Sequence, residues 1–160
     1  MFRLVAGVLG CAAIAGCATP AATPTPCGGG DPAGLRMRDI IAADNARDLQ
    51  RVLSYYTADV VWTPPPPRPK MEGIAAIRSS YETMYATLEP TLTISIESTW
   101  ATGDTARVTG RTGGKLHPKA GGEDTVVNDQ FVAELRCEGG GWRVASMVWW
   151  PAVEPPPIIR

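Results

Sequence analysis

The sequence predicts an α+β protein in which a curved antiparallel sheet of four long strands wraps around two or three N-terminal helices. Three observations predict this class. Apolar residues recur at helical spacing before Pro90, they alternate with polar residues after it, and proline clusters at 64–69 and 151–157 interrupt both patterns. Helices followed by a run of strands are typical of a sheet that carries its helices on one face.

The helical pattern begins at Leu35 and extends to residue 56, where it predicts two short helices or one bent helix. Asp44 and Asn45 are expected to cap the second helix, with Asp48 in its first turn. Residues 60–62 predict a brief strand. A further amphipathic helix is predicted from Gly73 to Pro90, where proline ends it.

The alternating pattern predicts strands at residues 91–100, 106–111, 127–135 and 142–150. The glycine-bearing segments between them are expected to be turns or loops, the longest over residues 117–124. In the first strand, alternation places Ile94, Ile96, Ser98 and Trp100 on one face. Strands of this length usually bend, and Ser98 and Gly110 are the expected bend sites.

The N-terminus has the features of a bacterial lipoprotein signal. A positively charged start is followed by thirteen uncharged residues, 4–16, too few for a membrane-spanning helix of roughly 20 residues. Residues 14–17 (Ile-Ala-Gly-Cys) resemble a lipobox, which implies cleavage before Cys17 and lipidation of its sulfur. A rival lipobox at Cys11, an ordinary secretory signal and a buried N-terminal helix are the alternatives.

The chain is therefore divided into a signal peptide (1–16), a lipidated cysteine and Pro/Gly-rich tether (17–34), a domain (35–150) and a proline-rich tail (151–160). Ala18 after the lipidated cysteine implies, by the same resemblance, an outer-membrane anchor with the domain facing the periplasm. In that oxidising compartment Cys27 and Cys137 either form a disulfide or remain two unrelated thiols.

Composition argues against several classes of function. The formal net charge is −1 and no basic block occurs, so we expect no nucleic-acid partner. One histidine and the two cysteines left after processing are too few for a zinc site built from His and Cys, and we expect neither a metal nor a cofactor.

Three motifs resemble those of one family. Residues 56–62 (Tyr-Thr-Ala-Asp-Val-Val-Trp), 73–77 (Gly-Ile-Ala-Ala-Ile) and 141–146 (Gly-Trp-Arg-Val-Ala-Ser) occur in the order seen in SnoaL-like domains of the nuclear-transport-factor-2-like (NTF2-like) superfamily. The resemblance covers residues 35–150. It implies a cone-shaped sheet with an apolar pocket between sheet and helices, homodimers formed through the outer sheet face, and, in catalytic members, a buried Asp or His acting as a general base.

The candidate catalytic residues are few. Aligned with steroid isomerases of this superfamily, the general-base position falls at Pro64, which cannot accept a proton. Asp129 is placed by alternation on an apolar face, where it is either functional, paired with an arginine, or turned outward by a bulge. Asn128 replaces it if the register shifts by one residue. Asp59 and His117 are expected to be a capping residue and a solvated loop residue.

Aromatic side chains concentrate on the elements that are expected to line the cone. They are either core residues or the walls of a ligand pocket. The predicted pocket residues are Trp62, Tyr81, Tyr85, Trp100, Phe131 and Trp149.

Taken together, these patterns predict a membrane-anchored periplasmic lipoprotein that binds a small hydrophobic ligand or a partner protein, and with Pro64 at the general-base position they favour binding over catalysis. Two alternatives remain open. One is a SnoaL-type cyclase, isomerase or hydrolase that uses Asp129 or Asn128 with Tyr81 or Tyr85. The other is a structural subunit of an envelope complex, with the proline tail as a docking segment.

Overall fold

The computed structural model describes Cys27 and residues 30–152. The two candidate lipoboxes, with Cys17 and Cys11, lie outside the described residues, as do most of the tether and the tail after residue 152. Among the described residues, no helix is both long enough and apolar enough to cross a bilayer.

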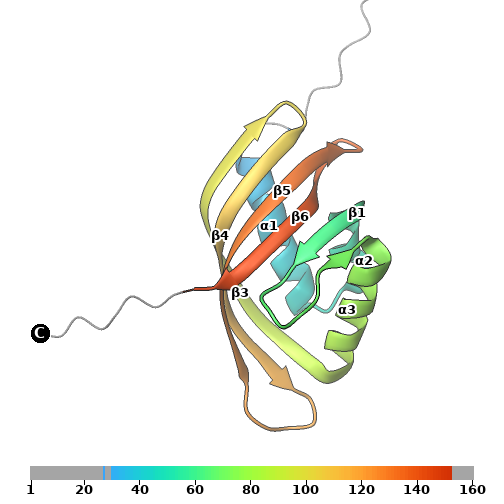
Figure 1. The fold of residues 1–160 in the computed structure, drawn as a ribbon, viewed down its shortest axis with the longest axis vertical. Helices are drawn as coiled ribbons and strands as arrows, with labels where there is room; N and C mark the ends of the chain where they lie inside the picture. Colours follow the sequence, from blue (N-terminus) through green and yellow to red (C-terminus); the bar gives the residue numbers. More distant parts are fainter. Residues whose placement is uncertain (1–26, 28–29, 153–160) are drawn as a thin grey trace, which may run out of the picture.

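The described part of the chain has the predicted α+β cone architecture, with helices first and long strands last (Figure 1). Its elements are α1 (Gly30–Asn45), α2 (Leu49–Ser54), β1 (Tyr56–Thr63), β2 (Met71–Glu72), α3 (Ile74–Thr87), β3 (Leu88–Thr102), β4 (Thr105–Pro118), β5 (Thr125–Glu138) and β6 (Gly141–Pro151). The strands form one sheet in the order β2-β1-β6-β5-β4-β3, and β1 and β6 are its parallel pair. The sheet curls around α1, while α3 lies beside β1 and β2 (Figure 1).

A bulge between β3 and β4 bends the sheet where the sequence predicts it. Ile96 pairs with Gly110 and Ser98 pairs with Thr109, so one residue of β3 has no partner. A Cβ atom on Gly110 would lie 2.2 Å from the backbone oxygen of Ser95 and 3.0 Å from the Phe131 ring. The two strands can therefore approach this closely because residue 110 has no side chain.

The same bulge makes the predicted orientation of Trp100 wrong. Beyond an unpaired residue the side-chain alternation shifts by one, so Thr99 and Ala101 are partly buried and Trp100 turns outward. Its side chain is 60% exposed. Alternation in the sequence predicts the face correctly up to the bulge and incorrectly after it.

Three predicted boundaries also differ from the structure. Helix α1 begins at Gly30, inside the segment predicted to be tether. Strand β3 begins at Leu88 and includes Pro90, which is compatible with a strand because β3 is the sheet edge. Strand β4 continues to Pro118, since it pairs with β3 along its whole length, so the predicted loop after residue 116 begins later.

The turn between α1 and α2 is capped differently from the prediction. Asp48 is the N-cap of α2, and its Oδ1 accepts a hydrogen bond from the Arg51 backbone N–H at 3.0 Å. Asn45 fastens the end of α1 to the edge strand: its Nδ2 donates to the Leu92 carbonyl at 2.9 Å, and its Oδ1 accepts from the Leu92 N–H at 2.7 Å. Asp44 lies inside α1 and caps nothing.

A disulfide bond joins Cys27 to Cys137, with their Cα atoms 5.7 Å apart. Cys137 is the next-to-last residue of β5, and Cys27 precedes α1. Of the two alternatives left by the sequence, the structure has the bonded pair. The bond attaches the chain that leads into the domain to the sheet.

Candidate ligand-binding site

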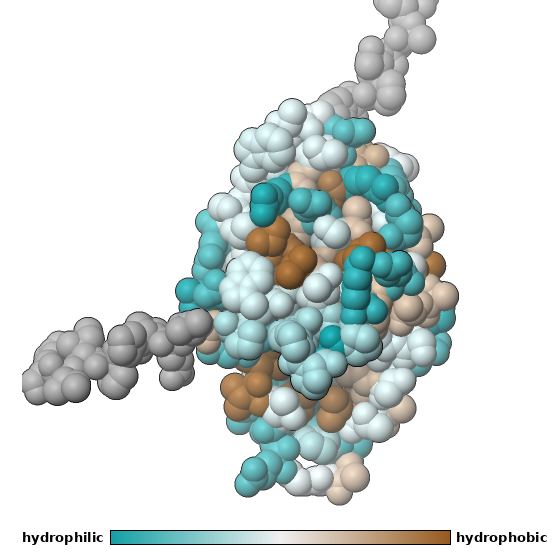
Figure 2. Space-filling view, viewed as in Figure 1, coloured by the Kyte–Doolittle hydropathy of each residue, from teal (hydrophilic) through white to brown (hydrophobic). Residues whose placement is uncertain are grey.

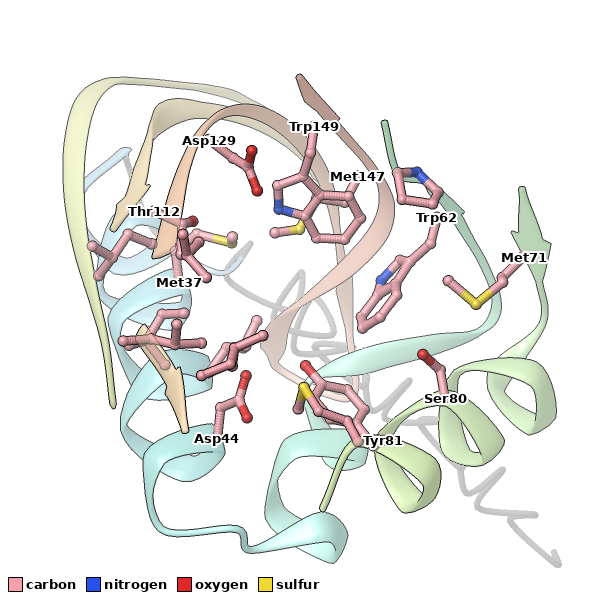
Figure 3. Close-up of a pocket in the computed structure, with 18 of the residues that line it drawn as sticks. Met37, Asp44, Trp62, Met71, Ser80, Tyr81, Thr112, Asp129, Met147 and Trp149 are labelled. Carbon is pink, nitrogen blue, oxygen red and sulfur yellow. The ribbon is translucent and has the colours of Figure 1, made fainter. Parts of the chain in front are cut away.

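A cavity of about 200 Å³ lies between the helices and the concave face of the sheet (Figure 3). Side chains from α1, α3, β1, β2 and the four long strands border it. Most of them are apolar or aromatic, and the polar exceptions are Asp44, Arg68, Ser80, Thr112 and Asp129. The cavity is thus an apolar space with a few polar groups, which is the usual composition of a small-molecule site.

Four aromatic residues form one wall. The Trp62 ring lies 5.4 Å from the Tyr56 ring, 5.3 Å from that of Tyr81 and 5.1 Å from that of Trp149, each edge to face. The hydroxyl groups of Tyr56 and Tyr81 are hydrogen-bonded at 3.1 Å. Burial raises the pKa of both tyrosines, so both stay protonated. Trp62 is only 8% exposed, yet its Nε1–H has no hydrogen-bond partner.

Four of the five methionines of the chain border the cavity, each from a different element. They are Met37 of α1, Met71 of β2, Met84 of α3 and Met147 of β6. Methionine is flexible and polarizable, so this lining can adjust to the shape of a ligand. The methionines are far apart in the chain and share no motif, so the sequence does not predict that they meet at one cavity.

Asp44 is the most buried charged group of the site. It is 6% exposed, and the Tyr85 hydroxyl donates a hydrogen bond to its Oδ1 at 3.0 Å. Burial raises the pKa of Asp44 to about 6, against the opposite effect of this hydrogen bond. The prediction that Asp44 caps the second helix is therefore wrong. The spacing of Asp44 contained the signal, since residues 37, 40, 41 and 44 follow one helix face and all border the cavity.

Asp129 lies on the inner face of β5, as alternation in the sequence predicts. It borders the cavity beside its register partner Thr112 on β4, and it is half-buried. Burial raises its pKa and the charge of Arg68 lowers it, but no salt bridge joins the two side chains. In Figure 3, Asp129 and Asp44 approach the cavity from opposite sides. Asn128 is exposed on the other face of the strand.

Only half of the predicted aromatic pocket residues border the cavity. Trp62, Tyr81 and Trp149 do. Phe131 is instead a core residue, 1% exposed, that does not border the cavity, and Trp100 is on the outer face of the sheet. Tyr85 acts indirectly, by holding Asp44. Pro64, at the position aligned with the isomerase base, is buried at the cavity wall.

The other two candidates lie away from the cavity. Asp59 is exposed and forms an ion pair with Arg136. His117 is hydrogen-bonded through Nδ1 to Asp124 at 2.7 Å, on the surface. Within residues 27 and 30–152, no three His, Cys, Asp or Glu side chains come together as metal ligands.

The outer face of the sheet carries several large apolar side chains. Val148 and Trp150 alternate with the inward-facing Met147 and Trp149 on β6, and they are 41% and 38% exposed. In the view of Figure 2, hydrophobic side chains occur in separate groups among hydrophilic ones.

Comparison with known proteins identifies the family. A model of the SnoaL-like domain matches residues 37–145. Among solved structures, a ketosteroid isomerase-like protein from Erwinia carotovora atroseptica has 24% identity and a TM-score of 0.68, covering 78% of this chain and 96% of that one. The search of curated proteins gave no match.

Two further structures have the same fold. A conserved protein from Planctomyces limnophilus is 18% identical with a TM-score of 0.69, covering 76% of this chain and 95% of that one. An NTF2-like protein of unknown function from Shewanella oneidensis is 14% identical with a TM-score of 0.63, covering 74% of this chain and 96% of that one. At these identities the likeness shows the fold alone. The chain thus has the NTF2-like cone fold and belongs to the family of SnoaL-like domains.

Proposed function

We propose that this protein is a lipid-anchored protein of the bacterial envelope whose cone binds a small, flat, largely apolar molecule. The open cavity of about 200 Å³ with its aromatic and methionine lining carries this proposal. For comparison, an apolar cavity of about 150 Å³ is large enough to hold benzene. A ligand of one or two rings therefore fits the space.

The unfilled space favours a ligand over a purely structural core. A structural subunit is expected instead to fill the cone with its own rings, whereas the rings of Trp62, Tyr81 and Trp149 leave a cavity beside them.

The test is native mass spectrometry of the full chain purified from its own host. We expect a co-purifying small molecule, and we expect the variant Ser80→Phe, which places a ring in the cavity from α3, to lose it. A wild-type protein that is empty in repeated preparations contradicts the proposal. The same spectra measure the mass of the assembly, and a dimer is expected if the outer sheet face pairs with a second copy.

The anchor is a separate part of the proposal. Lipidation of Cys17 would place the domain close to a membrane, because nine residues separate Cys17 from Cys27, which is bonded to β5. At roughly 3 Å per residue, an extended proline-rich segment of this length spans some 30 Å. The ligand would then enter from the periplasm or from the membrane surface.

Replacing Cys17 with alanine is expected to release the protein from the membrane fraction. Several acyl chains anchor a protein firmly, since each buried methylene contributes about 0.8 kcal/mol. The variant lacks the sulfur atom to which the lipid would be attached. Cell fractionation followed by immunoblotting measures the outcome. Cys11→Ala is the matched control and should leave the protein in the membrane; the reverse result assigns the lipobox to Cys11.

A second candidate function is acid–base catalysis on the bound molecule. Asp44 and Asp129 are favoured for it, because burial raises the pKa of each at the wall of an apolar cavity. Once a ligand is identified, turnover that Asp44→Asn or Asp129→Asn abolishes while binding persists would establish catalysis. Turnover as fast as that of the wild type in both variants would exclude these two carboxyl groups as the catalytic groups.

A further inference from the structure

We propose that the ligand of the cavity is an organic cation, a protonated amine or a cationic nitrogen heterocycle, whose charged nitrogen lies against Asp44. This proposal rests on the proposed function, since it specifies the chemical class of molecule that the cavity takes. Three features of the described residues support it: an unpaired buried carboxyl group, an aromatic wall, and the balance of charge around the cavity.

The first feature is that Asp44 has no cationic partner. At 6% exposure it borders the cavity, and its one side-chain hydrogen bond comes from the neutral Tyr85 hydroxyl. No salt bridge among the described residues includes it. A carboxylate has about four acceptor positions, and buried charges in proteins are normally paired. A ligand N–H or ammonium group therefore finds free acceptor capacity at this point.

The second feature is the set of rings beside that carboxyl group. Trp62, Trp149, Tyr56 and Tyr81 all border the same cavity as Asp44. The face of an aromatic ring attracts a cation within about 6 Å of its centre, and tryptophan does so most strongly. A flat cation in this cavity is thus attracted by the rings along its body and by the carboxylate at its charged atom.

The third feature is the sum of charges at the cavity wall. The charged side chains that border it are Asp44, Asp129 and Arg68, which give one net negative charge. Arg68 influences Asp129, on the side opposite Asp44. The titratable groups that face Asp44 are the protonated tyrosines 56, 81 and 85, and they add no positive charge. An anionic ligand would meet uncompensated repulsion at Asp44.

The experiment compares three probes with the same ring: 4-methylbenzylamine, 4-methylbenzyl alcohol and 4-methylbenzoate. Calorimetric titration of the full chain at about pH 8 measures each affinity. We expect the amine to bind at least about tenfold more tightly than the alcohol and the benzoate to bind most weakly. In Asp44→Asn the amine should bind no more tightly than the alcohol.

Asp124→Asn is the matched control, since it makes the same chemical change at an exposed carboxyl group that does not border the cavity, and it should keep the preference for the amine. Thermal melting confirms that both variants are folded. If the alcohol binds as tightly as the amine, or if the preference survives in Asp44→Asn, the ligand class is wrong but the proposed function stands. If neither the alcohol nor the amine binds, both proposals fail.

Discussion

Replacing Cys27 and Cys137 together with serine should lower the free energy of unfolding by about 2–5 kcal/mol. The disulfide connects residues separated by 110 positions, so it restricts the unfolded chain strongly. It also fixes the chain that precedes α1 to the far end of β5. Urea denaturation of the wild type and the double variant, followed by circular dichroism, measures the difference.

Two controls accompany this experiment. The single variants Cys27→Ser and Cys137→Ser should each lower the free energy of unfolding by about as much as the double variant, because either change removes the same bond. Adding a reductant to the wild type should give the same loss and should not affect the double variant. A wild type whose stability is unchanged by reduction would show that the bond does not form.

Asp44→Asn should make the protein more stable at about pH 8, by up to about 3 kcal/mol. The carboxyl group has a pKa of about 6 in the folded protein against its ordinary value of 3.8, and each pKa unit of this difference corresponds to about 1.4 kcal/mol. Asparagine keeps an oxygen that can accept the hydrogen bond from Tyr85 but carries no charge to bury. Urea denaturation over a series of pH values measures the gain.

The sign of the pH dependence follows from the raised pKa. Below about pH 4 the carboxyl group is protonated in both states, so wild type and variant should have similar stability. Between about pH 4 and pH 6 the unfolded chain is ionised while the folded wild type still holds its proton, so the wild type loses stability relative to the variant over this range, and the difference is constant at higher pH. Asp124→Asn is a control for which we expect the opposite change. His117 and Lys115 lower the pKa of this exposed carboxyl group, so its replacement should reduce stability at pH 8 more than at low pH. A gain in Asp44→Asn that is equal at pH 4 and pH 8 would contradict this explanation.

A buried carboxyl group that destabilises the fold fits best with a role in binding or catalysis. Proteins commonly retain local features that cost stability where function needs them. Asp44 occupies a position on the stripe of Met37, Ile40 and Ile41, where an apolar residue would pack without this cost.

The fold was predictable because its elements have clear periods. Helical spacing before Pro90 and alternation after it locate α1, α3 and the long strands, and three short motifs point to the family. Alternation also places Asp129 correctly, since no bulge separates it from Phe131 and the rest of the inner face of β5. It fails for Trp100, because the bulge after Ile96 depends on contacts between strands rather than on β3 alone.

The site was harder to predict, for reasons that differ between residues. Asp44 followed the helical spacing, but its neighbour Asn45 and the later Asp48 made a cap the simpler interpretation. The methionines converge from four elements, which no local pattern reveals. Cys27 and Cys137 are far apart in the chain, so their pairing depends on the fold. The cavity itself is space that remains between side chains of eight elements, and only their packing defines it.

The most direct test of a ligand-binding cone is a nuclear magnetic resonance titration of the full chain with methyl-labelled methionine and labelled tryptophan, using 4-methylbenzyl alcohol as the probe. Saturable shifts are expected for the methyl groups of Met37, Met71, Met84 and Met147 and for the indole N–H of Trp62, which all border the cavity. The indole N–H of Trp100, on the outer face, should not move. Shifts confined to Trp100, or no saturable shift at all, would contradict a binding site inside the cone.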